Sequence, residues 1–254
     1  MNFTVGDQDF EFEGNTYTKV YLPSEGAYRF LKNGKNVDIY EWNKVVNRYH
    51  PMSHKATHPN RIIRWIEKHR WHLTRRHIAP KKARFILDIG CESGNIASIL
   101  ASEDRKVILM DVDPQVLSSM KEKTDRFSMA SLAADIYNLP FTDGSVDRVI
   151  CTEVLEHLLA PGQAAQEMKR ILKTGGRMVV SVPNDRLILW VKRQLIRIGL
   201  RRFLGKLSPG LAMGHLHIFN KASLVSLFQA DLEVVRCFYN IPWFTNIFLV
   251  AEKK

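Results

Sequence analysis

The chain has 254 residues, of which 45% are apolar and 25% are charged, a composition typical of a folded globular protein. No run of about 18 apolar residues occurs, so no membrane-spanning helix is expected. The first nine residues are polar and acidic and lack the apolar core of a secretory signal peptide. The three cysteines are odd in number and widely spaced, which favours a reducing compartment over a disulfide framework. We therefore expect a cytoplasmic protein.

The net charge of +11 is concentrated in two stretches of the chain. Residues 44–84 hold twelve Lys or Arg against one acid, Glu67, and residues 186–206 hold seven Lys or Arg and no acid. Charge clustered in this way favours an anionic partner, such as a phosphate, a nucleic acid or a membrane surface. A solvated basic face is the alternative for each stretch.

Residues 1–82 are predicted to form an N-terminal extension that covers the active site of a core domain. Residues 8–22 alternate apolar and polar side chains around a turn at residues 13–15, which predicts a hairpin. Residues 41–78 carry helical apolar spacing that is interrupted by Pro51 and Pro59, which predicts two helices joined by a loop.

From residue 83 to residue 254 the pattern becomes that of an α/β domain with a doubly wound sheet. Short apolar runs bounded by Gly, Asp or Pro predict buried parallel strands at 85–89, 107–110, 146–151 and 178–182. Helical patterns lie between them at 95–102, 114–123 and 162–173. The last two strand-like runs, 232–239 and 244–251, are joined by only four residues, which permits an antiparallel pair but no crossover.

The segment Phe85–Gly94 predicts a strand that runs into a tight turn of small residues before a helix. Gly90 and Gly94 would let the backbone approach a ligand closely, and the N–H groups at a helix start favour an anionic group. Asp88, at the end of the strand, would accept from a ligand ammonium or order the turn. Asp111 ends the next strand, where an acid takes both hydroxyls of an adenosine ribose. Asp135 ends a further strand at the same sheet edge.

In these motifs the chain resembles the class I S-adenosylmethionine (SAM)-dependent methyltransferases. The matching segments are Leu87–Gly94, Asp111, Ala134-Asp135, Leu139–Phe141, Asp147, Glu153–His157, Arg170–Gly176 and Val180–Pro183. The resemblance covers residues 83–254 and implies a Rossmann-like, seven-stranded sheet whose last strand is antiparallel. It implies that Gly90 and Gly94 cradle the methionine part of SAM, that Asp111 takes the ribose and that Asp135 with Ile136 reads the adenine. The expected cofactor-binding residues are Asp88, Gly90, Cys91, Gly94, Asp111, Val112, Asp135, Ile136 and Glu153.

Glu92 departs from the family pattern, which usually has a glycine there. Its carboxylate would lie near the carboxylate of the cofactor, and like charges repel. This departure raises the alternative of a non-catalytic SAM-fold binding module.

Glu153, Glu156 and His157 form an E-x-x-E-H run. At the start of a helix, these positions would share one face and offer a partial shell for a divalent cation. The run resembles those of the ubiquinone-pathway O-methyltransferases and of the 2′-O-methyltransferases that modify small-RNA 3′ ends, in both of which it is implicated in metal binding. The resemblance to the RNA branch implies that His217 completes the shell. The divalent metal would be Mg²⁺, Mn²⁺ or Zn²⁺. The alternative is that the acid and the histidine of the run bind no metal and only cap a helix or line the acceptor pocket.

Without a metal, a histidine would act as general base, because histidine titrates near neutral pH. The candidate catalytic residues are therefore Glu153, His157, His215 and His217. His50, His54 and His58, beside the proline loop, are weaker candidates.

Residues 186–213 are predicted to form a basic insertion or lid. Within 186–207, Leu187, Trp190, Val191, Leu195 and Ile198 share one helical face and arginines another, a pattern that suits a helix in a membrane interface. A lid over the active site and a phosphate-contacting RNA helix remain alternatives.

The sequence thus predicts a SAM-dependent methyltransferase that acts on an oxygen of a small or lipid-linked hydroxylated acceptor, with possible metal assistance. The basic helix would bring it to the inner face of a membrane. RNA 2′-O-methylation is the alternative enzymatic activity.

Overall fold

A computed structural model describes residues 4–12, 15–22, 27–36, 61–79, 83–102, 104–127, 129–199 and 215–254. Within these ranges, no helix has the length and apolar character that crossing a membrane requires. The predicted helix near residue 45 and the histidines at 50, 54 and 58 lie outside the described residues, as do residues 200–213 of the predicted lid.

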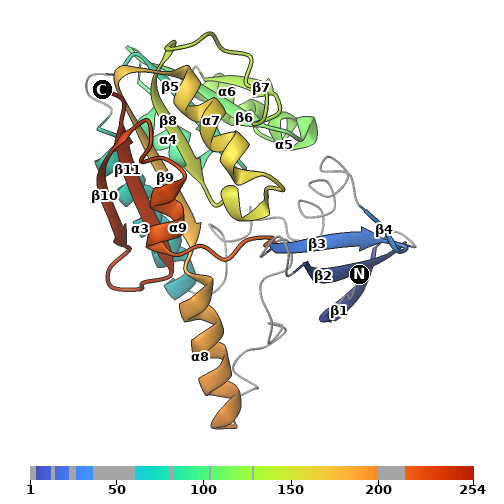
Figure 1. Cartoon of the computed structure of the whole chain (residues 1–254). Coiled ribbons are helices and arrows are strands. Elements are labelled where there is room, and N and C mark those ends of the chain that lie inside the picture. Colours follow the sequence, from blue (N-terminus) through green and yellow to red (C-terminus); the bar gives the residue numbers. More distant parts are fainter. Residues whose placement is uncertain are drawn as a thin grey trace.

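A seven-stranded sheet forms the centre of the molecule, in the order β10-β11-β9-β8-β5-β6-β7 (Figure 1). Strands β9, β8, β5, β6 and β7 are parallel, and β11 pairs antiparallel with both β9 and β10. The predicted α/β class and the antiparallel final strand are therefore confirmed. The strands are β5 (Phe85–Ile89), β6 (Lys106–Asp111), β7 (Ala130–Ala133), β8 (Val146–Thr152), β9 (Leu172–Pro183), β10 (Glu233–Tyr239) and β11 (Asn246–Glu252).

Helices cover both faces of this sheet, each over its own apolar core. Helices α7 (Pro161–Ile171) and α9 (Lys221–Ser226) contribute side chains such as Met168 and Leu224 to the core on one face. Helices α3 (Arg61–Ile78), α4 (Asn95–Leu100) and α5 (Pro114–Ser118) contribute to the core on the other face. Because both faces are covered, the inner strands are apolar throughout, as their uninterrupted apolar runs predict.

Two element boundaries differ from the predictions. The predicted helix at 114–123 is two helices, α5 and α6 (Lys121–Arg126), which meet at a turn. Strand β9 begins earlier than predicted, because the Gly175–Gly176 backbone bonds to the C-terminal segment. The Gly175 N–H donates to the Lys253 carbonyl at 2.7 Å, and the Lys253 N–H donates to the Gly176 carbonyl at 3.0 Å.

The N-terminal part contains a separate four-stranded antiparallel sheet, in the order β1-β2-β3-β4. Strand β1 (Thr4–Phe12) pairs with β2 (Asn15–Leu22), as the hairpin prediction requires, and β3 (Ala27–Lys32) and β4 (Lys35–Asn36) follow. Helix α3 is the second predicted helix of the extension. Helix α8 (Asp185–Arg197) corresponds to the start of the predicted basic insertion and extends away from the sheet (Figure 1).

Candidate active site

The turn after β5 brings the backbone into close contact with neighbouring strands. Gly90 has a left-handed φ of 66°, and its N–H donates to the Met110 carbonyl at 2.8 Å. A Cβ atom at Gly90 would lie 2.3 Å from a methyl group of Val154, so no side chain fits there. The turn therefore requires glycine for both its dihedral angle and its packing.

Two buried carboxyl groups lie beside this turn. Asp88 is 2% exposed, and its burial raises the pKa to about 7, with further contributions from the carboxylates of Asp111 and Glu92. Asp111 is also buried, which raises its pKa, while its Oδ1 accepts the Asp113 N–H at 3.0 Å. Parallel strands end here at one sheet edge, as the sequence predicts.

The remaining predicted cofactor residues lie along the same edge. Val112 follows β6 and is half-buried, and Cys91 is buried in the turn. Asp135 follows β7, is half-buried and accepts the Tyr137 N–H at 2.9 Å, whereas Ile136 is buried. The edge thus presents an apolar surface beside oxygen acceptors, which suits a nucleoside.

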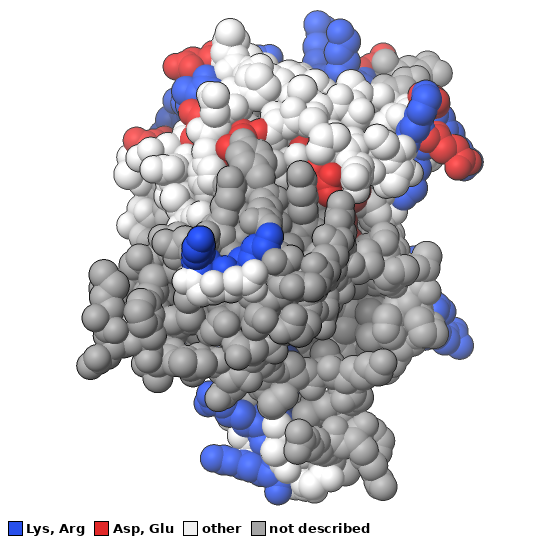
Figure 2. All heavy atoms as spheres, turned by 90° about the vertical axis from the view of Figure 1, so that its right-hand side faces the viewer, with Lys and Arg blue, Asp and Glu red and all other residues white. Residues whose placement is uncertain are grey.

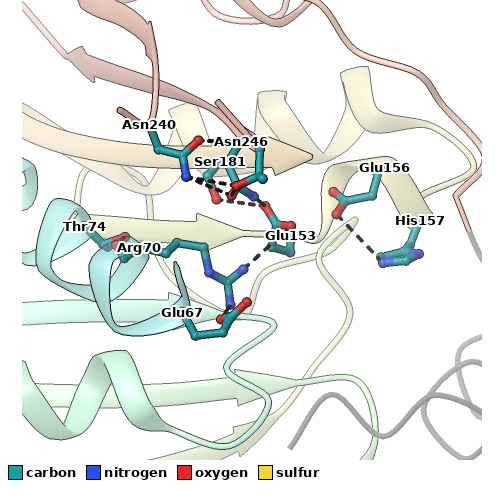
Figure 3. A network of polar contacts seen from close by, with 10 residues as sticks. Glu67, Arg70, Thr74, Glu153, Glu156, His157, Ser181, Asn240 and Asn246 are labelled. Carbon is teal, nitrogen blue, oxygen red and sulfur yellow. Dashed lines mark hydrogen bonds and ion pairs between the residues drawn. The ribbon is translucent and has the colours of Figure 1, made fainter. Parts of the chain in front are cut away.

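Helix α3 supplies a cation that the site predictions missed. Arg70 is 5% exposed and its Nη2 donates to Glu67 at 2.7 Å (Figure 3). Its Nε and Nη1 atoms are buried without a hydrogen-bond acceptor among the described residues. Both residues line a pocket with Asp88, Gly90, Cys91, Glu92, Ser93 and Thr152. The signal in the sequence was Glu67, the single acid of the first basic stretch, three residues before Arg70 on a helix.

Glu153 takes part in a polar network that also includes Arg70. It accepts hydrogen bonds from Ser181 Oγ at 3.1 Å and Asn246 Nδ2 at 2.9 Å, and its other oxygen lies 3.7 Å from Arg70 Nη1 (Figure 3). The predicted helical start is wrong, because Glu153 has a left-handed φ of 60° and only Leu155–His157 form a 3₁₀ turn. Glu153 therefore does not share a face with Glu156 and His157.

A different group of ligating side chains lies beyond this turn. Glu156, His157 and His215 offer atoms that all lie within 4.8 Å of one another. His215 Nδ1 lies 2.9 Å from the buried carboxylate of Asp185, the first residue of α8. Among the described residues, this group replaces the predicted set of Glu153, Glu156, His157 and His217. The Glu156 carbonyl accepts the N–H of His217, but the ring of His217 packs beside Phe219.

Comparison with known proteins agrees with this geometry. Residues 87–180 match the family model described as a methyltransferase domain. Residues 87–180 therefore form a methyltransferase domain of the SAM-dependent class I type. The match begins within β5 and ends within β9, and so includes the glycine turn and the Glu153–His157 run.

The curated relatives match only part of this chain. A protein named as a probable S-adenosylmethionine-dependent methyltransferase of Mycobacterium tuberculosis is 31% identical over 121 residues, which are 47% of this chain and 43% of that protein. An uncharacterized protein of Methanocaldococcus jannaschii is 36% identical over 104 residues, 41% of this chain and 43% of that protein. The chain thus matches less than half the length of these relatives.

Solved structures share the fold of the methyltransferase domain at low sequence identity. The N-methyltransferase NodS of Bradyrhizobium japonicum, in complex with S-adenosyl-L-homocysteine, has a TM-score of 0.59 at 18% identity and covers 85% of this chain and 99% of its own. The PH0226 protein of Pyrococcus horikoshii has a TM-score of 0.63 at 17% identity and covers 82% of this chain and 99% of its own.

Two cations of the chain interact electrostatically with Glu92. Glu92 adopts a left-handed φ of 49°, in which a glycine is favoured. Arg70 and Lys123 each interact electrostatically with its carboxylate, and Lys123 Nζ donates to the Ser93 carbonyl at 2.6 Å. The repulsion expected between Glu92 and a cofactor carboxylate is therefore offset by two nearby positive charges.

Proposed function

We propose that this protein transfers the methyl group of SAM to a hydroxyl oxygen of a small or lipid-linked acceptor, held beside Glu156, His157 and His215. The observation that carries the proposal is the pairing of two adjacent sites. A pocket lined by the buried Arg70, whose Nε and Nη1 have no acceptor in the described part of the chain, lies on one side of Glu153. The group of Glu156 and the two histidines lies on the other side (Figure 3).

The pocket around Arg70 fits SAM. Arg70 Nε and Nη1 would donate to the methionine carboxylate, because buried guanidinium donors are costly without acceptors. Asp88 would face the ammonium group, Gly90 would leave room for the methionine backbone, and Asp111 would accept from the ribose hydroxyls. When bound, SAM supplies an electrophilic methyl group. The protein contributes alignment and the exclusion of water.

The group of Glu156, His157 and His215 fits a divalent cation. A carboxylate and two imidazoles suit a metal that binds nitrogen and oxygen ligands, such as Zn²⁺ or Mn²⁺. When His215 Nδ1–H donates a hydrogen bond to Asp185, the lone pair of the ring is on Nε2. This is the arrangement of a metal-ligating histidine with a supporting carboxylate. A cation held there would lower the pKa of a bound hydroxyl.

One assay series tests this function. Calorimetry with SAM comes first, followed by methyl transfer to small phenols, quinol lipids and an RNA with a free 3′ end, with EDTA or with added metal. Glu156→Ala and His215→Ala should lose metal-dependent transfer while SAM binding persists, and His72→Ala, at an exposed position on α3, should keep both. Transfer that survives EDTA would reject the metal and leave His215 as general base. Methylation of the RNA alone would redirect the proposal to 2′-O-methylation.

A further inference from the structure

The exposed apolar side chains of the described residues gather at one edge of the molecule. Eight large apolar side chains are exposed in the described part of the chain, and six of them lie on or directly after α8, on the β10–β11 link or at the start of α3. We call these six the docking edge: Trp65, Trp190, Val191, Ile198, Ile241 and Phe244. Their exposed fractions range from 41% for Val191 to 66% for Ile198 and Ile241.

Contacts between elements make the docking edge continuous. Asn184, which precedes α8, donates its N–H to the Thr245 carbonyl at 2.7 Å and its side-chain amide to the Phe244 carbonyl at 2.9 Å. The ring of Trp243, in the same β10–β11 link, lies 4.8 Å from that of Trp65 on α3. The link therefore holds α8 and α3 together at the end of the sheet where β9 finishes.

Arginines accompany the apolar side chains on α8. Arg186, Arg193 and Arg197 are exposed beside Trp190, whereas Lys192 on the other side of the helix is buried. The acid of the helix, Asp185, is buried against His215. In Figure 2 the described side chains at the lower end, where α8 extends, are blue or white, and the red ones lie nearer the top.

We infer that the docking edge binds an anionic membrane surface, with α8 lying in the lipid interface. Trp190 lies on the exposed part of α8 between arginines one and two turns away, and Val191 lies further around the helix, with Ile198 directly after its end. This combination of aromatic, aliphatic and cationic side chains matches the chemistry of that interface. The exposed arginines would pair with lipid phosphates, while Trp190 and Ile198 would enter the boundary with the acyl chains. Base stacking with a nucleic acid is less well served, because a single aromatic side chain accompanies these arginines.

The same helix joins this surface to the candidate acceptor site, since α8 begins at Asp185, which binds His215. An acceptor anchored in the lipid would therefore approach the site along α8. The approach of the acceptor along α8 rests on the proposed function, whereas membrane binding does not. The two can be told apart, because a variant that no longer binds vesicles should still methylate soluble phenols.

Co-sedimentation of the full chain with vesicles tests the inference. Vesicles of equal parts phosphatidylcholine and phosphatidylglycerol should bind the protein, and phosphatidylcholine alone should bind it far less. Each arginine near an anionic surface contributes a factor of roughly five, so Arg193→Glu with Arg197→Glu should weaken binding at least about 25-fold. The control is Arg75→Glu with Arg76→Glu, the same charge change at exposed positions of α3, which should bind like the wild type.

A second pair of variants separates docking from simple charge attraction. Trp190→Ala with Ile198→Ala should weaken binding at least about tenfold, because both side chains would leave water on docking. Phe127→Ala with Val235→Ala, two exposed apolar positions outside the docking edge, should change little. Equal vesicle binding by the wild type and all variants would overturn the inference. A wild-type protein that binds neither kind of vesicle would overturn it as well. Tighter binding to a single-stranded RNA than to anionic vesicles would overturn it in favour of nucleic acid.

Discussion

The guanidinium of Arg70 on helix α3 lies 3.7 Å from the carboxylate of Glu153, which follows strand β8. This ion pair joins the N-terminal extension to the carboxyl edge of the central sheet, where the cofactor pocket lies. It also withdraws Glu153 from the neighbouring group of Glu156, His157 and His215. One contact thus separates the cofactor pocket from the proposed acceptor site.

Arg70→Lys should weaken SAM binding by roughly tenfold to 100-fold, because a charge-assisted hydrogen bond contributes about 1.5–3 kcal/mol and Lys cannot reproduce the guanidinium fork. Calorimetry with S-adenosylhomocysteine and with adenosine checks this. Adenosine lacks the carboxylate, so its affinity should not change. Equal losses for both ligands would show that Arg70 acts by supporting the fold.

SAM affinity should rise about tenfold between pH 6 and pH 8, because the pKa of buried Asp88 is raised to about 7 and the ligand ammonium favours its ionised form. Asp88→Asn should remove this dependence. Calorimetry across the pH range, with the variant as control, makes the measurement. A flat profile in the wild type would contradict the role given to Asp88.

The same shift affects the stability of the cofactor-free protein. Because the folded pKa lies above the unfolded value, the contribution of Asp88 is complete below about pH 4 and is lost as pH rises to about 7. Thermal unfolding of the wild type should therefore show this loss relative to Asp88→Asn, with no further difference above pH 7. A wild type that gains stability relative to Asp88→Asn between about pH 4 and pH 7 would contradict the raised pKa of Asp88.

Gly90→Ala should lower the free energy of unfolding by about 1–3 kcal/mol and abolish SAM binding, since the added Cβ meets Val154 at 2.3 Å. Adding Val154→Ala should recover part of the stability by removing the clash, while the left-handed φ remains strained. Thermal unfolding of the single and double variants checks this. A Gly90→Ala protein as stable as the wild type would contradict the packing described here.

Glu92→Gly should tighten SAM binding by roughly fivefold, because it removes a carboxylate from the pocket. It should also raise the free energy of unfolding by about 1 kcal/mol, because glycine adopts the left-handed conformation without that cost. Glu92→Gln keeps the strain and removes the charge, so calorimetry should show tighter SAM binding while thermal unfolding shows no gain in stability from the backbone. Weaker binding in both variants would instead indicate a direct favourable contact between Glu92 and the cofactor.

The order of strands and helices in the core could be predicted because buried parallel strands are apolar throughout and end at Gly or Asp. The cofactor edge followed from the same pattern, since Asp88 and Asp111 each lie at or near the end of a strand. Local spacing could not show that Glu153 takes a left-handed conformation, because its partners Ser181 and Asn246 come from distant strands. The contact of Asp185 with a histidine could not be predicted, because its partner His215 lies 30 residues away in the sequence.

The burial of Arg70 could not be predicted from the sequence for a different reason. It is one of twelve cations in its stretch, and composition favours an exposed role for all of them. Burial against Glu67 and Glu153 distinguishes it, and burial depends on how α3 packs over the sheet.

Methyl transfer from SAM to an oxygen beside His215 is the activity proposed for this protein. The most direct measurement incubates the protein with SAM carrying an isotope-labelled methyl group and identifies the product bond by NMR, for the wild type and for His215→Ala. We expect an O-methyl product whose rate of formation falls at least about 100-fold in the variant. A labelled methyl group on nitrogen or carbon, or an equal rate in the variant, would contradict it.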